Sequence, residues 1–162
     1  MKKSFAQHEP KKREGALAPL FERLVDFDTD ALQEPFVQKF YDSEEVKDSI
    51  ERELLHLLGT KVKIRKEDYL ALAKDPLNYA LPFMYGTPDF SYFEGTNTEQ
   101  WQPFSKYVAK AIEAFEPRLS NIGVRVIGVD NQKQFLDIEI NAMINFCGFF
   151  EEATFAIKMK AA

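Results

Sequence analysis

The sequence predicts an α+β fold, in which helices pack on one face of a small, mostly antiparallel sheet of three C-terminal strands. Two patterns predict this fold: apolar residues recur with the 3.6-residue period of helices before residue 116 and alternate as in strands after it. The chain has 162 residues, of which 45% are hydrophobic, and this is enough for one domain with a sizeable core. We therefore expect a flexible basic tail over residues 1–15 and a single domain over residues 16–162.

Composition argues against several classes of protein. The net charge of −5 gives no general attraction to nucleic acid or to an anionic membrane. No run approaches the roughly 20 apolar residues of a membrane span and no signal peptide is evident, so we expect a cytoplasmic protein without direct membrane insertion. Cys147 is the only cysteine and lies in an apolar stretch, which predicts a buried, inert thiol. With only His8 and His56 besides, we expect no metal site and no cofactor.

The first apolar residues of the domain follow helical spacing: Leu17, Leu20, Phe21, Leu24 and Val25. They predict a short amphipathic helix, with Pro19 tolerated in its first turn. The apolar side of this helix either packs on the protein's own core or docks on a neighbouring subunit, because the segment stands apart from the main body in sequence.

A clear helix begins after Asp42, whose side chain can cap free amides while Glu45 completes a capping box. Its buried side consists of apolar residues at helical spacing: Val46, Ile50, Leu54, Leu57 and Leu58. Gly59 is expected to end this helix in the left-handed conformation. His56 lies off the buried stripe and is expected to be solvated or hydrogen-bonded.

The middle of the chain is less regular. Residues 61–65 alternate as in a short strand, residues 66–74 predict a further helical turn, and Asp75 followed by Pro76 is a typical helix start. Residues 79–95 carry too many Tyr and Phe side chains for a solvated loop, so they either cover the core or contact a partner. No basic residue is interleaved with these rings, which argues against stacking on nucleobases.

A second clear helix leads into the sheet. Its apolar residues are Trp101, Phe104, Val108, Ala111, Ile112 and Phe115. Pro117 disfavours helical geometry at Glu116, so we expect the helix to end there. Alternating apolar residues then predict strands over residues 122–127, 136–145 and 152–160, with a polar turn at residues 129–133.

Glu116 and Arg118 lie where this helix turns into extended chain. Residues two apart in extended chain point to the same side, so the acid and the base are expected to stand side by side. A carboxylate is unfavourable at a helix C-terminus, and its presence needs a reason. Two interpretations remain open: a local ion pair that locks the corner, which the residues alone favour, or a charged contact for a partner.

The corner resembles a known family. The segment Phe-Glu-Pro-Arg-Leu at residues 115–119, between an Ala-Ile helix and a Val-x-Val strand, is similar to the type VI secretion baseplate family TssE, relatives of the sheath-initiating wedge protein of contractile phage tails. Further segments resemble this family in the same order: residues 20–24, 54–60, 77–82, 85–91 and 152–155. The chain departs from the family at Gly59, where Asn is more usual, and the family's middle segment is split or duplicated around Tyr79 and Tyr85.

The resemblance implies a structural baseplate wedge subunit that binds TssF and TssG and initiates sheath polymerisation by strand pairing. It also implies that TssK and the first ring of sheath subunits lie nearby, in a baseplate docked at the inner membrane. With the amphipathic segment, it gives six candidate partner-binding residues: Leu20, Phe21, Leu24, Glu116, Pro117 and Arg118. On this interpretation the corner meets a partner, and Arg118→Glu is expected to leave folding nearly intact.

The main alternative is a peptidoglycan hydrolase, because the related phage family carried a lysozyme label. No Gly-rich phosphate loop, Gly-x-Ser-x-Gly elbow or His-Glu-x-x-His motif is present, so a carboxylate pair would have to cut a glycosidic bond. Glu116 is the best single candidate, but Arg118 beside it stabilises the ionised form, which is the wrong direction for a general acid. We therefore expect no catalytic residue; a small adaptor outside any secretion machine is a third possibility.

Overall fold

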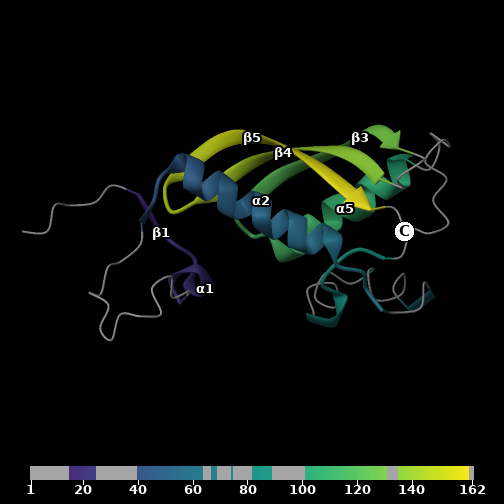
Figure 1. Ribbon diagram of the computed structural model, residues 1–162, viewed down its shortest axis with the longest axis horizontal. Coiled ribbons are helices and arrows are strands. Elements are labelled where there is room, and N and C mark those ends of the chain that lie inside the picture. Colours follow the sequence, from purple (N-terminus) through teal and green to yellow (C-terminus); the bar gives the residue numbers. More distant parts are fainter. Residues whose placement is uncertain are drawn as a thin grey trace, which may run out of the picture.

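The computed structural model describes residues 15–24, 40–63, 67–68, 74, 82–88, 101–130 and 135–160. The main body consists of helices α2 (Ser43–Gly59) and α5 (Trp101–Phe115) and strands β3 (Leu119–Asp130), β4 (Phe135–Phe146) and β5 (Phe149–Lys160). The smaller elements are β1 (Ala16–Leu17), α1 (Leu20–Arg23), β2 (Phe40–Tyr41) and the short 3-10 helix η1 (Pro82–Met84). Both long helices pack on one face of the sheet (Figure 1), which confirms the predicted α+β fold.

The main sheet is an antiparallel meander in the order β3-β4-β5. Along β4 the burial alternates residue by residue, as the apolar alternation predicted, and the fully buried side chains are Leu136, Ile138, Ile140 and Ile144. α5 packs beneath β3 and α2 packs beneath β5, so the apolar stripes of both helices meet the buried face of the sheet. Together they form the main hydrophobic cluster, beside which Val62, Met84 and Ala111 form a second, smaller one.

Strand β3 is longer and less regular than the sequence predicted. It begins at Leu119, three residues before the expected start, because Leu119 already pairs with Ile144 of β4. Two register shifts interrupt the pairing, one between Ser120 and Gly123 and one further along the strand. At the first shift Asn121 takes a φ of 52°, a left-handed conformation that asparagine tolerates better than most residues.

Helix α2 begins as predicted and ends differently. The Asp42 side chain accepts a hydrogen bond from the Glu45 amide, and the Glu45 side chain accepts one from the Asp42 amide. Gly59 remains helical, so the expectation that it takes the left-handed conformation is wrong. Thr60 ends the helix instead, because its hydroxyl and its amide both donate to the carbonyl of His56.

The N-terminal segment does not form the single helix that its spacing predicted. Leu17 belongs to a two-residue strand, in which Ala16 and Leu17 pair with Tyr41 and Phe40. Helix α1 begins only after Pro19, whose carbonyl accepts a hydrogen bond from the Arg23 amide at 3.1 Å. Pro19 therefore precedes the first turn, and the segment splits because the strand pairing satisfies the backbone before the helix starts.

Cys147 is exposed, and the expectation of a buried thiol is wrong. It forms with Gly148 the two-residue connection between β4 and β5, at φ angles of 47° and 93°. Connections of this kind need two residues in left-handed conformations, which places them at the surface end of a hairpin. The apolar neighbours of Cys147 belong to the two strands and misled the prediction.

The middle of the chain is described only in part. Of the short strand expected at residues 61–65, residues 64 and 65 lie outside the described residues, and Lys61 forms a single parallel bridge with Thr87. In η1 the Met84 side chain is fully buried, while Phe83 is 54% exposed. Of the segment expected at residues 79–95, Met84 thus packs into the protein and Phe83 faces outward. The helical turn predicted at residues 66–74 falls largely outside the described residues, as do the expected helix start at residue 75, most of residues 79–95 and the turn after residue 130.

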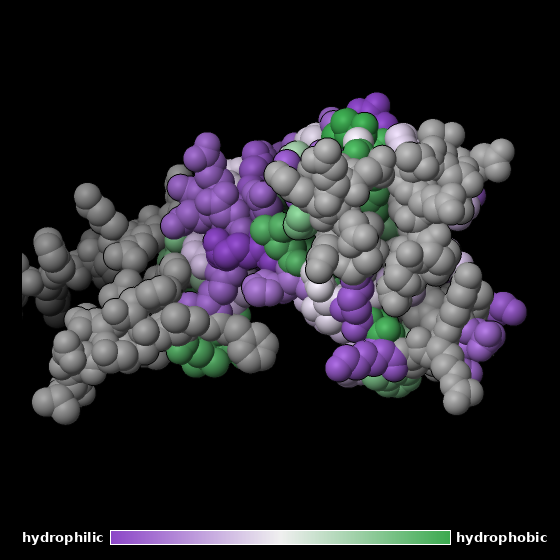
Figure 2. Space-filling view, turned by 45° about the vertical axis from the view of Figure 1, so that its right-hand side comes forward, coloured by the Kyte–Doolittle hydropathy of each residue, from purple (hydrophilic) through white to green (hydrophobic). Residues whose placement is uncertain are grey.

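On the coloured part of the surface in Figure 2, hydrophobic residues form several patches among hydrophilic ones. Over the described residues, the large apolar side chains that are exposed come from different elements: Leu20, Leu24, Leu55, Phe83, Ile127 and Phe150. Scattered residues of this kind are normal on a soluble surface unless a rigid element presents several together. In the part of the chain that the structure describes, α1 and its flank present two of them, Leu20 and Leu24.

Candidate partner-binding site

The corner between α5 and β3 is fixed by backbone hydrogen bonds. The Glu116 amide still donates to the Ile112 carbonyl at 2.8 Å, and the Leu119 amide donates to the Glu116 carbonyl at 3.1 Å. The Arg118 carbonyl then accepts from the Asn145 amide of β4 at 2.7 Å. The helix thus ends as Pro117 predicted, and the chain enters the sheet within three residues.

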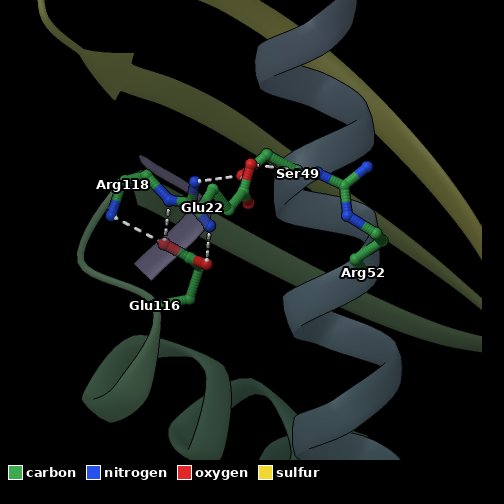
Figure 3. A network of polar contacts seen from close by, with 5 residues as sticks. All are labelled: Glu22, Ser49, Arg52, Glu116 and Arg118. Carbon is green, nitrogen blue, oxygen red and sulfur yellow. Dashed lines mark hydrogen bonds and ion pairs between the residues drawn. The ribbon is translucent and has the colours of Figure 1, made fainter. Parts of the chain in front are cut away.

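Glu116 and Arg118 stand side by side, as their spacing predicted. Arg118 Nε lies 2.7 Å from Glu116 Oε1 and Arg118 Nη2 lies 2.6 Å from Glu116 Oε2, and this forms a bidentate pair (Figure 3). The Arg118 amide also donates to Glu116 Oε1, at 3.2 Å. Glu116 is only 4% exposed, and the Arg118 side chain is 11% exposed. The corner is therefore held by an ion pair that is almost completely buried.

Further groups hold the Arg118 guanidinium in place. Its centre lies 5.7 Å from the centroid of the Phe146 ring, within the range of a cation–π contact. Burial acts to lower the pKa of Arg118, but the hydrogen bonds and attraction of Glu116 outweigh it and raise the pKa above its ordinary value. The arginine is therefore held firmly in its charged form.

The buried pair continues into a network that reaches the N-terminal helix. Ser49 of α2 accepts a hydrogen bond from Arg118 Nη1 at 2.8 Å and donates one to Glu22 Oε1 of α1, also at 2.8 Å. Glu22 in turn accepts hydrogen bonds from Arg52 Nη2 at 3.2 Å and from the Tyr41 hydroxyl. We call these five residues, together with Glu116, the corner network; it ties α1, β2 and α2 to the start of β3.

Titration in the corner network follows these contacts. Burial acts to raise the pKa of Glu22, but the hydrogen bonds from Tyr41 and Ser49 and the charge of Arg52 lower it below its ordinary value of 4.5. Burial and the neighbouring Glu22 carboxylate raise the pKa of Tyr41 to about 12. Both shifts favour an ionised Glu22 beside a neutral tyrosine near neutral pH.

The structure treats the predicted site residues differently. Glu116 and most of Arg118 lie inside the protein, while Pro117 is exposed at the tip of the corner. Leu20 is 57% exposed and Leu24 is 69% exposed, so neither packs on the protein's own core. The side chain of Phe21 lies outside what the structure describes. The two groups of predicted residues are joined through Glu22 and Ser49.

Sequence reasoning missed Glu22 and Ser49. A signal for Ser49 existed, because it is a polar residue on the buried stripe of α2, between Val46 and Ile50, and it is fully buried. A buried hydroxyl needs hydrogen-bond partners, which would have pointed to a polar group opposite this position. Glu22 left no comparable signal, since acidic residues are ordinary on a short helix.

The corner network is suited to holding chain segments together. Both oxygens of the Glu116 carboxylate are engaged by the guanidinium of Arg118, which leaves the carboxylate badly placed to exchange a proton with a bound substrate. Among the described residues, no three or more His, Cys, Asp and Glu side chains are placed to hold a metal ion. Within the same residues, the helices are too short or too polar to cross a membrane.

The fold and the corner thus define a class of small structural module, in which helices and a sheet are clamped by one buried ion pair. The sequence model of the family described as baseplate wedge protein gp25 matches residues 44–146, which is more than half of the chain. The chain therefore belongs to the gp25 family of baseplate wedge proteins, structural components of contractile injection machines. Among curated proteins, none matches the sequence.

Two solved structures are similar to the chain. One is a chain of the baseplate complex from the type VI secretion system, with 14% sequence identity and a TM-score of 0.48 over 72% of this chain and 95% of that one. The other is a candidate tail lysozyme from Geobacter sulfurreducens, with 15% identity and a TM-score of 0.47 over 75% of this chain and 96% of that one.

Proposed function

We propose that the chain is the wedge subunit that binds TssF and TssG in a type VI secretion baseplate. The observation that carries the proposal is the presentation of Leu20 and Leu24, which are exposed on a helix whose Glu22 is anchored in the corner network. A preorganised apolar surface loses little conformational entropy on binding, so a short helix held in this way suits a partner contact. Phe21 belongs to the same proposed contact.

The Glu-Pro-Arg corner has a double role in this proposal. Glu116 and Arg118 lock the corner from inside, while Pro117 and the small exposed part of the Arg118 side chain are what a partner can reach. A partner at this point gains orientation more than affinity, because a buried pair serves specificity and geometry.

In the same proposal, the β-sheet β3-β4-β5 is the part of the chain that initiates polymerisation of the sheath. Its two outer strands each have one side that no other described strand pairs with. Unpaired amides and carbonyls on such an edge can bind a strand of the first sheath ring in a fixed register. The same proposal includes proximity to TssK and a baseplate docked at the inner membrane, with the chain on the cytoplasmic side.

Co-purification with TssF and TssG of the same source tests the proposal. The wild type is expected to form a stable complex, and the double variant Leu20→Glu/Leu24→Glu is expected to lose it while remaining folded. The matched control Leu55→Glu/Phe83→Glu places the same charges at two other exposed apolar sites and is expected to bind normally.

A wild type that does not bind TssF and TssG would contradict the proposal. In that case purified peptidoglycan is the next substrate to test, and turnover that is lost in Glu116→Gln would support the hydrolase alternative. Loss of the complex in both double variants would instead show that any added charge prevents assembly, and would remove α1 from the proposed contact.

A further inference from the structure

A groove lies between α2 and β5. It has a volume of about 380 Å³ and is lined by Glu44, Lys47, Asp48 and Glu51 of α2 and by residues 152–155 of β5. β5 pairs with β4 without a register shift, and within the described residues no strand pairs with its outer side. The described part of the chain therefore leaves a regular, open edge along this groove.

The groove is acidic. Four carboxylates line it, those of Glu44, Asp48, Glu51 and Glu152. The only lining cation is Lys47, whose Nζ lies 3.0 Å from the carboxylate of Glu151, outside the lining. The other ion pairs among the described residues do not involve the four lining carboxylates. Like charges this close repel one another, so a positively charged occupant would be favoured.

The N-terminal residues leave the described chain at one end of this groove. Ala16 pairs with Tyr41, and Gly15 lies so close that a Cβ on it would be 2.7 Å from the Tyr41 carbonyl oxygen. Tyr41 directly precedes the cap of α2, and β1 lies beside the N-terminal end of this helix (Figure 1). The Ser43 hydroxyl donates a hydrogen bond to Glu151 of β5 at 2.5 Å, so β5 reaches the same end.

Residues 1–14 have the opposite charge to the groove. They contain five cations and two carboxylates: Lys2, Lys3, Lys11, Lys12 and Arg13, and Glu9 and Glu14. Three of the cations are consecutive, at residues 11–13, and extended chain places them within about 14 Å of Gly15. The carboxylates from Glu44 to Glu51 extend over about 10 Å along the axis of α2. The basic run is therefore long enough to face them.

We propose that residues 1–14 dock in the groove of their own chain, with the cations of residues 11–13 against the carboxylates of α2. The inference goes beyond the proposed function and does not depend on it. Charged chain laid along the open side of β5 is one of the ways in which proteins protect an unpaired strand from other copies. Exposed ion pairs are individually weak, so another chain can displace the docked residues.

The covalent connection favours the chain's own residues over those of a second copy. A short linker gives the attached segment an effective concentration on the order of millimolar. A contact made of a few exposed ion pairs is therefore populated within one chain, whereas the same contact between two chains needs a concentrated sample.

Limited proteolysis of the full-length protein tests the docking. Trypsin cleaves after the cations of residues 11–13, and it cleaves only the fraction of molecules in which this segment is undocked. In low salt, Asp48→Asn/Glu51→Gln is expected to accelerate this cleavage about two- to fivefold. The control Glu67→Gln/Glu113→Gln removes two exposed carboxylates outside the groove lining and is expected to change it little. Added salt should remove the difference between wild type and the groove variant.

NMR spectroscopy locates the contact. Lys11→Ser/Lys12→Ser/Arg13→Ser is expected to shift the amide signals of the groove lining, at residues 44–51 and 152–155. Raising the salt concentration of the wild type should shift the same signals in the same direction, because both changes release the docked segment.

The control Lys63→Ser/Lys74→Ser/Lys106→Ser removes three exposed cations from other parts of the surface and is expected to leave the groove signals unchanged. Equal shifts in the two triple variants, or equal cleavage of the two carboxylate variants, would overturn the inference. Protection from trypsin that increases with protein concentration would assign the groove to a second copy and overturn docking within one chain. Neither measurement needs TssF or TssG, so normal docking without that complex would defeat the proposed function alone, and the reverse result would defeat only this inference.

Discussion

At the scale of single residues, the buried pair of Glu116 and Arg118 is where a single substitution is expected to cost the most folding stability. A buried ion pair contributes little net stability compared with apolar packing, but the removal of one partner leaves an uncompensated charge inside the protein. Both groups of this pair are almost fully buried, and their charges are matched by a bidentate contact. Replacing only one of the two residues is therefore expected to destabilise the protein strongly.

We predict that Arg118→Met lowers the free energy of unfolding by about 3 kcal/mol or more, because Glu116 is left buried without its partner. Denaturant unfolding monitored by circular dichroism measures this. The matched control is Arg125→Met, which breaks an ion pair of the same 2.6 Å length to Glu139, but whose arginine side chain is 72% exposed. The control is expected to have little effect, and equal losses in the two variants would contradict the prediction.

The burial also changes the expectation for Arg118→Glu. That variant places a second carboxylate against Glu116, so a large loss of stability is expected in place of nearly intact folding. Neutralising both groups in Glu116→Gln/Arg118→Met should recover part of the stability lost in Arg118→Met, which is the coupling that a double-mutant cycle measures. A double variant less stable than Arg118→Met would contradict the energetic coupling between Glu116 and Arg118.

The pKa of Glu22 leads to a prediction about pH. Because this pKa lies below its ordinary value of 4.5 in the folded protein, folding favours the ionised carboxylate. The resulting stability is present above the pKa of the unfolded chain and is lost as pH falls through the folded value. We predict that Glu22→Gln lowers the urea midpoint at pH 7 and that the difference from wild type shrinks at about pH 3. An unchanged difference would contradict the role of Glu22.

At the scale of elements, the backbone around Gly86 and Gly59 gives a contrasting pair. A Cβ on Gly86 would lie 2.5 Å from the Thr60 carbonyl oxygen, and Gly86 has a φ of 117°. Gly59 is helical, and a Cβ there would meet nothing within 4 Å. We predict that Gly86→Ala destabilises the protein by roughly 1–3 kcal/mol through strain, whereas Gly59→Ala stabilises it by about 0.5 kcal/mol. Thermal unfolding of both variants measures this, and a stable Gly86→Ala protein would contradict the close approach of these segments.

The sequence predicted the elements whose burial follows one simple period. β4 is buried on every second residue, and α2 begins with a capping box between Asp42 and Glu45, so both could be recognised locally. β3 could be recognised only in its centre, because the bulge at Asn121 breaks the alternation before it. The burial of Cys147 was predicted wrongly because apolar neighbours indicate a strand but do not show where the strand ends.

The candidate site was predictable in its local part and not in its tertiary part. Glu116 and Arg118 are two residues apart, and their contact follows from extended geometry. The contacts of Ser49 with Glu22 and Arg118 join residues 27 and 69 positions apart in sequence, which no local pattern specifies. The exposure of α1, which distinguishes docking from self-packing, likewise depends on the assembled core.

At the scale of the whole molecule, the corner network separates two surfaces. On one side it anchors α1, with Leu20 and Leu24 exposed. On the other it begins the sheet, whose far border is the regular edge of β5. If the chain binds its neighbours through α1, as we propose, the sheet edge stays available for a different chain. Membership of the family and the geometry of the two surfaces are consistent with one role in assembly.

The most direct test of this account is hydrogen–deuterium exchange of the chain alone and in a mixture with TssF and TssG. The account predicts slower exchange in the mixture at the amides of α1 and at the corner that contains Pro117, with the outer edge of β5 unchanged. Exchange that is identical everywhere, with and without the two proteins, would contradict the claim that this chain binds TssF and TssG.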